Sequence, residues 1–290
     1  MRSLAASTQT LPFELGEPRS FHGLTLTPLF PAEPPQLDYI GLDEAVARGL
    51  KIDEIDSDGA VQTLVVDNPL ADRVLFYEGE ELVGAKQNRI IRGTVLVEAT
   101  ATMKLAVHCV ERGRWSFSSP RFAPAPRAAY PELRRAQRAG QDAVWTEIGV
   151  KQMRMRSVSE TDAAEQLYVD HLRLLDEYVE ALPRADGQCG ALVGVGGRIV
   201  CLDYVSRSDV FAGIYAKLLR GYALSAIENP VDRPLGKSHV GRFLGELELA
   251  ERIPRAAGGL GEHGELTEYA IGKELVVDGE VVALTAFPSR

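Results

Sequence analysis

The spacing of hydrophobic residues divides the chain into a strand-rich first half and a second half in which helices and hairpins alternate. Short runs rich in β-branched residues and interrupted by glycines predict strands within residues 22–29 and 60–115. A short helix is expected over residues 42–50, because Leu42, Val46 and Leu50 recur four residues apart. The stretch 121–130, rich in proline and alanine, predicts a loop.

Apolar residues at helical spacing dominate from residue 130 onward. We expect helices over 131–146, from a cap at Thr161 and Asp162 to Pro183, from Ser208 onward, and over 238–252. Two hairpins are predicted by turn pairs that tolerate positive φ, Gly196-Gly197 and Asp278-Gly279. A shift of 82 residues aligns the two hairpins, which indicates either an internal repeat or two hairpins that obey one pattern.

These elements predict an α+β fold, with a β-rich N-terminal half packed against a C-terminal half of hairpins and helices. Residues 1–20 are rich in Ser, Thr and Pro and are expected to form a flexible N-terminal arm. Residues 21–290 are expected to form a single domain. A sub-boundary near residues 120–160, where strands give way to helices, is the alternative.

Composition and charge narrow the classes of partner. The chain has 290 residues, 45% of them hydrophobic, and a formal net charge of −9. A surface this acidic repels phosphates on average, so we expect neither nucleic acid nor an anionic membrane as partner. The three cysteines are expected to be reduced, and the N-terminus lacks the apolar core of a signal peptide. No apolar run approaches the length of a membrane helix, so a cytoplasmic location is expected.

The familiar catalytic sequence motifs do not occur. There is no GxSxG, HExxH, CxxC or GxxxxGK[ST] pattern, and the five histidines are far apart in sequence. His108 and Cys109 are adjacent in a predicted strand and would face opposite sides. We therefore predict no metal site, and the sequence names no cofactor.

Two polar clusters stand out from this background. In a continuous strand through residues 78–92, Glu81, Gln87 and Arg89 would share one face, with Lys86 and Asn88 on the other, although the glycines at 79 and 84 can break this phase. The second cluster, CVERGRW at 109–115, contains Glu111, Arg114 and Trp115. An arginine beside an aromatic ring suits a phosphate and a stacked base. Internal ion pairs joining Arg89 to Glu81 or Glu111 are the structural alternative.

Asp203 lies at the end of a predicted hairpin strand, just before the helix that Ser208 opens. A carboxylate in this position suits a ligand, and it equally suits a helix cap.

The segments around these clusters resemble a known family. GLDEAVARGLKIDEI, VDNPLADRVLFYEGEELVGAKQNRIIRGTVLV and HCVERGRW are similar to the ARG and rhodanese-phosphatase-superfamily-associated domain, a bacterial family, and the resemblance extends over about residues 20–287. The family name records an association with ADP-ribosylglycohydrolases. The resemblance thus implies a role near ADP-ribose or NAD metabolism by context, without a mechanism.

Two functional hypotheses follow. In the first, the protein binds a nucleotide or ADP-ribose-like small molecule, with Glu81 or Glu111 as general base if it is an enzyme. Cations would meet phosphates, amides would read polar edges and an aromatic ring would stack, which assigns ligand contacts to Lys86, Gln87, Asn88, Arg89, Arg114, Trp115 and Asp203. In the second, the polar cluster is internal and the protein is a non-catalytic scaffold whose apolar helices form a homo-oligomer.

Overall fold

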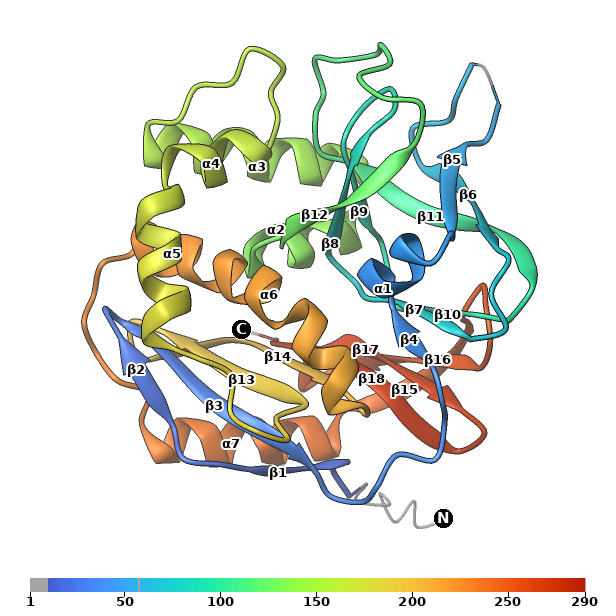
Figure 1. Ribbon diagram of the computed structural model, residues 1–290. Coiled ribbons are helices and arrows are strands. Elements are labelled where there is room, and N and C mark those ends of the chain that lie inside the picture. The colour runs from blue at the N-terminus through green and yellow to red at the C-terminus, as the bar shows by residue number, and fades with distance from the viewer. Residues whose placement is uncertain (1–9, 57, 290) are drawn as a thin grey trace, which may run out of the picture.

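The computed structural model describes residues 10–56 and 58–289, and within them the chain is an α+β fold, as predicted. A large antiparallel sheet forms one layer, two smaller sheets pack beside it, and a long helix runs between the layers (Figure 1). The first nine residues of the predicted N-terminal arm lie outside the described residues. The following residues pair with the large sheet in two short strands, so the prediction of an arm is wrong for these strands.

The large sheet joins both ends of the described chain. Its spatial order is β1-β3-β13-β14-β18-β17-β16-β15, and β2 pairs with β3 outside this path. The strands are β1 (Phe13–Leu15), β2 (Arg19–Phe21), β3 (Leu24–Pro31), β13 (Gly190–Val195), β14 (Arg198–Val205), β15 (Glu251–Ala256), β16 (Glu262–Thr267), β17 (Ala270–Val277) and β18 (Glu280–Pro288).

The two smaller sheets contain the rest of the β-rich first half. One has the order β12-β8-β9-β11-β6-β5 and the other the order β10-β7-β4. Their strands are β4 (Ile40–Gly41), β5 (Lys51–Glu54), β6 (Thr63–Asn68), β7 (Val74–Phe76), β8 (Glu80–Gly84), β9 (Arg89–Ile91), β10 (Val95–Val97), β11 (Ala101–Cys109) and β12 (Phe122–Ala128).

Helices fill the space between the sheets and cover the outer face of the large one (Figure 1). They are α1 (Leu42–Ala47), α2 (Pro131–Ala136), the 3₁₀ turn η1 (Gln137–Ala139), α3 (Gln141–Met155), α4 (Glu165–Asp170), α5 (Leu172–Ala181), α6 (Ser208–Glu228) and α7 (Lys237–Leu249). Alternate residues of β13 and β14 point to opposite faces of the large sheet. Val193 and Cys201 pack in the cluster that contains α6, whereas Leu192 and Leu202 pack with Phe243 of α7.

Helix α6 is long and apolar enough to cross a membrane, judged by length and composition alone. Its 21 residues include the charged Lys217 and Arg220, which is why no uninterrupted apolar run marks it in the sequence. In the fold it is the central core helix, and most of its residues are buried.

The two predicted hairpins are confirmed. Gly196 and Gly197 have φ of 57° and 79°, and Asp278 and Gly279 have φ of 51° and 85°. Positive φ at both central residues is the condition for a tight turn that matches strand twist, and it explains the preference for glycine there. Both hairpins also contain a register shift at the same relative place, after Val193 in the first and after Leu275 in the second, 82 residues apart.

The hairpins are related to each other by a local two-fold axis. Strand β14 pairs with β18 so that Asp203 lies opposite Thr285, and these residues are also 82 positions apart. The neighbouring pairs are Leu202 with Ala286 and Tyr204 with Leu284. Adding 82 to the number of either β14 residue gives the β18 residue of the other pair, as a two-fold axis between Asp203 and Thr285 requires. The shared bulge and this symmetric pairing favour the interpretation of a structural repeat.

Three local predictions are wrong: two predicted helices are interrupted, and one predicted loop contains an edge strand. The helix predicted over 131–146 is interrupted at Gly140, which has φ of 99°. The helix predicted from Thr161 begins only at α4, because Asp162 has φ of 51°, and it breaks again at His171. The predicted loop 121–130 contains β12, an edge strand, where prolines are tolerated because one side needs no N–H donors.

Candidate functional site

The β8–β9 hairpin decides which predicted site residues meet. Glu81 pairs with Ile90, and Arg89 pairs with Leu82 on one side and with Cys109 on the other. Cross-strand partners share a face, so Glu81 and Arg89 point to opposite faces of the sheet. The prediction that they share a face is therefore wrong, because the turn at residues 85–88 changes the phase.

Glu81 is buried and held by an arginine that the sequence did not indicate. Its two carboxylate oxygens accept hydrogen bonds from Nε (2.7 Å) and Nη2 (2.8 Å) of Arg127 on β12. Burial raises the pKa of Glu81, and the ion pair with Arg127 acts against this shift. Because both oxygens are occupied, the geometry makes Glu81 an anchor for β12 rather than a group open to substrate.

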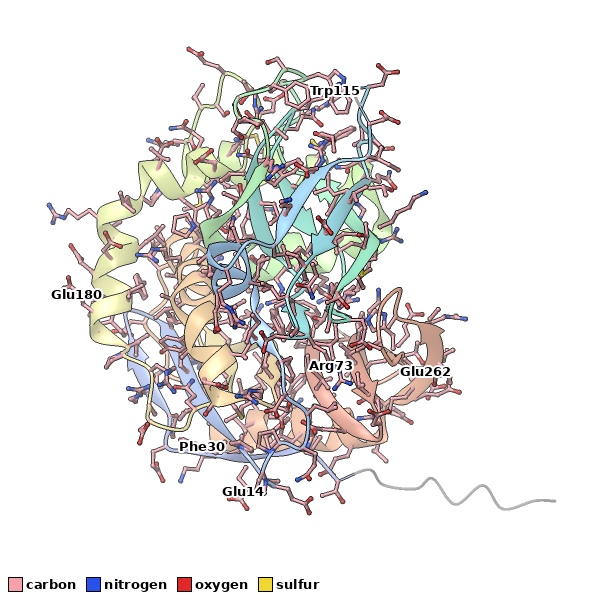
Figure 2. All side chains as sticks on the ribbon, turned by 45° about the vertical axis from the view of Figure 1, so that its right-hand side comes forward. Glu14, Phe30, Arg73, Trp115, Glu180 and Glu262 are labelled. Carbon is pink, nitrogen blue, oxygen red and sulfur yellow. The ribbon has the colours of Figure 1, made fainter. Side chains whose placement is uncertain are left out.

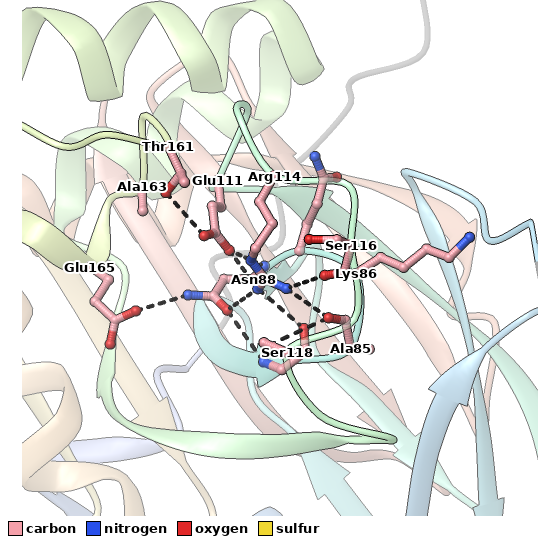
Figure 3. Close-up of polar contacts among 12 residues, drawn as sticks. Ala85, Lys86, Asn88, Glu111, Arg114, Ser116, Ser118, Thr161, Ala163 and Glu165 are labelled. Atoms are coloured by element: carbon pink, nitrogen blue, oxygen red, sulfur yellow. Dashed lines mark hydrogen bonds and ion pairs between the residues drawn. The ribbon is translucent and has the colours of Figure 1, made fainter.

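Glu111 and Arg114 form the centre of a second arrangement (Figure 3). Arg114 donates from Nη2 to Oε2 of Glu111 (2.6 Å) and to Oδ1 of Asn88 (3.2 Å), and from Nη1 to the carbonyls of Ala85 (2.6 Å) and Ser116 (2.8 Å). These bonds join the β8–β9 turn to the loop after β11. The role of Arg114 in this structure is to hold the two loops together.

Glu111 is accordingly the acceptor of several donors. Besides Arg114, it accepts from the backbone N–H of Asn88 (3.0 Å) and from the hydroxyl of Thr161 (3.0 Å). Burial acts to raise the pKa of Glu111, but the hydrogen bonds from Arg114 and Asn88 outweigh it, so that the pKa lies below its usual value. Such a carboxylate is a weak base.

The two carboxylates belong to one network although they do not touch. The side-chain amide of Asn88 donates to Glu165 (3.1 Å), and Arg127 bridges Glu165 (3.1 Å) to Glu81. Figure 3 shows the part of this chain of contacts around Asn88. The alternative of ion pairs from Arg89 to Glu81 or Glu111 is wrong, because these carboxylates bind Arg127 and Arg114 instead.

Arg89 stands apart from this network. It is fully buried, and its Nη1 donates to Oε1 of Gln87 (3.0 Å) and, at 3.4 Å, to the carbonyl of Asn88. In the part of the chain that the structure describes, Arg89 has no carboxylate partner, and its Nε and Nη2 have no acceptor. Burial lowers the pKa of Arg89. A buried guanidinium without an anion is costly and marks a candidate functional position.

An aromatic layer lies outside Arg89. The ring centroid of Trp115 is 5.8 Å from the guanidinium carbon of Arg89 and 5.1 Å from Nζ of Lys86. Lys86 also lies 5.4 Å from the ring of Phe117 and donates to the carbonyl of Asp58 (2.7 Å). Trp115 and Phe117 are 45% and 55% exposed. Trp115 lies at the outer end of the smaller sheet that contains β8 and β9 (Figure 2).

Asp203 does not join this site. It is fully buried on β14, where Nη1 (2.8 Å) and Nη2 (2.5 Å) of Arg134 bind its two oxygens. The hydroxyls of Tyr77 (2.7 Å) and Tyr222 (2.5 Å) donate to it as well. Burial acts to raise the pKa of Asp203, but Arg134 outweighs it, and the pKa is lowered. The capping interpretation is wrong, since α6 begins at Ser208 and its N-cap residue is Arg207, with no side-chain cap hydrogen bond.

Sequence reasoning missed several residues that organise the site. Arg127 was assigned to a loop, and the alternation of FAPAPRA over β12 is the signal that places it on a strand face. Phe117 lies two residues beyond the predicted cluster, and Thr161 was interpreted only as a cap. Among the described residues, no three His, Cys, Asp or Glu side chains gather as metal ligands would. All three cysteines are free, as predicted.

Comparison with known proteins gives one match. A family model, described as the ARG and Rhodanese-Phosphatase-superfamily-associated Protein domain, matches residues 12–287. No curated protein and no solved structure matches the chain.

Proposed function

The chain belongs to the ARG and Rhodanese-Phosphatase-superfamily-associated Protein domain family, and from this premise and the geometry around Arg89 we propose that it binds a phosphorylated small molecule of the nucleotide or ADP-ribose class. The binding site is formed by Lys86, Arg89, Trp115 and Phe117, here called the Arg89 site. The family name supports this choice of ligand class by association with ADP-ribosylglycohydrolases.

The carrying observation is the unmatched guanidinium of Arg89. The side chain is fully buried, yet Nε and Nη2 have no acceptor among the residues that the structure describes. Buried polar groups in native proteins are nearly always hydrogen-bonded, and a buried charge is normally paired. A phosphate oxygen would supply the acceptors that the chain does not, through the two-pronged geometry that suits guanidinium and phosphate.

The aromatic layer explains how such a ligand would be held. Trp115 covers Arg89, so a ligand reaches the guanidinium when the loop that carries Trp115 moves outward. The exposed rings of Trp115 and Phe117 then offer faces for a base or a nicotinamide-like ring. Lys86, which lies over both rings, adds a positive charge at the rim.

The remaining predicted residues position the site in this proposal. Arg114, Glu111 and Asn88 join the two loops that carry Lys86 and Trp115, and their polar groups are occupied by one another. Gln87 orients Arg89 through Nη1. Because Glu81 and Glu111 are both ion-paired, the geometry favours binding over acid–base catalysis.

Isothermal titration calorimetry with ADP-ribose, AMP, NAD and ribose 5-phosphate tests the proposal. We expect at least one of these ligands to bind, and expect Arg89→Met to weaken its binding by about tenfold or more, because a charge-assisted hydrogen bond contributes roughly 1.5–3 kcal/mol. Trp115→Leu is expected to weaken binding of the ligands that contain a ring and to spare ribose 5-phosphate.

The matched control is Tyr269→Leu, which removes an aromatic ring of similar exposure, 47%, on the turn between β16 and β17. It should leave all affinities unchanged. Absence of heat with all four ligands, or equal affinity in Arg89→Met and the unmodified protein, would contradict the proposal.

A homo-oligomeric scaffold is the second candidate, and one observation favours it. The outer helices α3, α4 and α5 leave apolar side chains exposed. Single exposed apolar residues are normal on a protein surface, but a group of them on neighbouring helices indicates an interaction surface. The most exposed are Met153, Val169, Leu172 and Leu174. Light scattering on the protein and on Leu172→Glu tests this candidate: a dimer that dissociates in the variant supports it, and a monomer in both excludes it.

A further inference from the structure

A polar cavity lies away from the Arg89 site, where α2 and η1 face the large sheet. Its volume is about 90 Å³, and its walls come from three directions. Arg134, Gln137 and Arg138 come from α2 and η1, Glu78 and Arg92 from the turns that flank β8 and β9, and Lys273 and Glu265 from paired positions of β17 and β16.

The floor of the cavity is formed by a row of cross-strand partners on one face of the large sheet. Asp203, Thr285, Lys273 and Glu265 are successive cross-strand partners on β14, β18, β17 and β16, so their side chains share one face. The first two residues of this row bind Arg134. The last two line the cavity together with Arg134, so the cationic member of the buried ion pair forms part of the cavity wall.

Charge is left over once the ion pairs around the cavity are counted. Arg134 is paired with Asp203, Arg138 with Glu78 (3.3 Å), and Glu265 with Arg255 (3.1 Å). Arg92 and Lys273 form no ion pair with any residue in 10–56 and 58–289. Two positive charges therefore remain at a cavity that is too small for a nucleotide but has room for a few waters or one small oxyanion.

The same residues carry buried atoms that lack partners. Within the described chain, no hydrogen bond reaches Nε2 or Oε1 of Gln137, Nε of Arg134, Nε of Arg138 or Oε2 of Glu78. Three of these groups are donors and two are acceptors. A fully ionised anion such as sulfate satisfies only donors, whereas a protonated oxyanion also offers an O–H to a carboxylate or amide oxygen.

We propose that this cavity binds a phosphoryl group, either inorganic phosphate or the terminal group of a phosphomonoester. The two unpaired cations match the charge of HPO₄²⁻, and its O–H matches the acceptor that Glu78 presents. Arg92 is exposed, so this side of the cavity reaches the surface and leaves an exit for the rest of an ester. The proposal is independent of the Arg89 site.

Calorimetry on the whole chain, in a buffer free of phosphate, provides the test. Inorganic phosphate, glycerol 3-phosphate and sulfate are titrated separately at neutral pH. We expect one equivalent of phosphate to bind about tenfold or more tightly than sulfate, and Lys273→Met and Arg92→Gln each to weaken it by about tenfold or more. Binding of glycerol 3-phosphate identifies an ester as an acceptable occupant, and its exclusion identifies the free ion.

Two controls separate this site from the rest of the molecule. Lys104→Met removes an exposed strand lysine outside the cavity and should leave phosphate binding unchanged. Arg89→Met removes the phosphate-binding group of the Arg89 site and should leave phosphate binding in this cavity unchanged, whereas loss of phosphate binding in Arg89→Met but not in Arg92→Gln would place the bound phosphate at the Arg89 site. Arg92 is exposed, so Arg92→Gln is expected to fold even if Lys273→Met does not. No phosphate binding at about 10 mM, equal binding of sulfate, or full affinity in Arg92→Gln overturns the proposal.

Discussion

Two arginines, Arg134 and Arg89, are equally buried but differ in their partners: Arg134 forms an ion pair and Arg89 does not. Both side chains are inaccessible to solvent. Arg134 binds both oxygens of Asp203, and the hydroxyl of Thr285 accepts from it as well (3.0 Å). Arg89 has an amide oxygen of Gln87 and a backbone carbonyl instead, with no carboxylate among the described residues.

The surroundings of the two side chains reinforce the difference. Asp203 also accepts from Tyr77 and Tyr222, so the carboxylate that pairs with Arg134 is fully hydrogen-bonded, and of the three guanidinium nitrogens of Arg134 only Nε has no acceptor among the described residues. Burial acts to lower the pKa of Arg134, but Asp203 outweighs it and the pKa is raised. Burial lowers the pKa of Arg89, and the acidic groups around it, Glu54 among them, do not outweigh this effect. The comparison teaches that burial of a charge alone does not mark function, whereas burial of a charge without an ion-pair partner does.

The largest expected effect comes from breaking the compensated pair. Asp203→Ala leaves Arg134 charged and buried, which should lower the free energy of unfolding by about 3–5 kcal/mol in urea denaturation followed by circular dichroism. The double variant Arg134→Met/Asp203→Leu removes both charges and should recover most of this loss. A loss below about 1 kcal/mol in Asp203→Ala would show that the two arginines do not differ as described.

An intermediate effect is expected at Glu111. Glu111→Gln weakens the bonds from Arg114 and Asn88 and should reduce stability at pH 7 by about 1.5–3 kcal/mol. Because the folded pKa of Glu111 is lowered, its contribution is present above the unfolded pKa, about 4, and is lost as the pH falls through the folded value. Urea denaturation at a series of pH values should therefore show the difference between the two proteins shrinking below about pH 4. A difference that is constant with pH would contradict this assignment.

Local features of the fold were predictable from the sequence because they depend on neighbouring residues. The two hairpins followed from turn chemistry at Gly196-Gly197 and Asp278-Gly279, and α6 from its apolar spacing. The breaks at Gly140 and His171 were not predicted, because a helical pattern continues across them. Strand β12 was missed because prolines exclude a central strand but allow an edge strand.

The candidate site was predictable in its composition but not in its pairing. The sequence placed Glu81, Arg89 and Glu111 in one region, and the structure places them on and after three neighbouring strands. Their partners Arg127 and Arg114 could not be assigned, because the phase of a strand changes at a turn of unknown geometry. For Asp203 the decisive partner, Arg134, lies 69 residues away, and only the packing of α2 on the large sheet brings the two together.

The smallest expected change in stability decides the comparison. Arg89→Met keeps much of the side-chain volume and removes a charge that has no carboxylate to leave behind, so the free energy of unfolding should change by no more than about 1 kcal/mol. Arg134→Met is the matched variant, and it should lower stability by about 3–5 kcal/mol because Asp203 is then buried alone. Urea denaturation of both variants measures the contrast. If Arg89→Met also loses 3 kcal/mol or more, then Arg89 is structural in the same sense as Arg134, and the Arg89 site has no acceptor left for a ligand to supply.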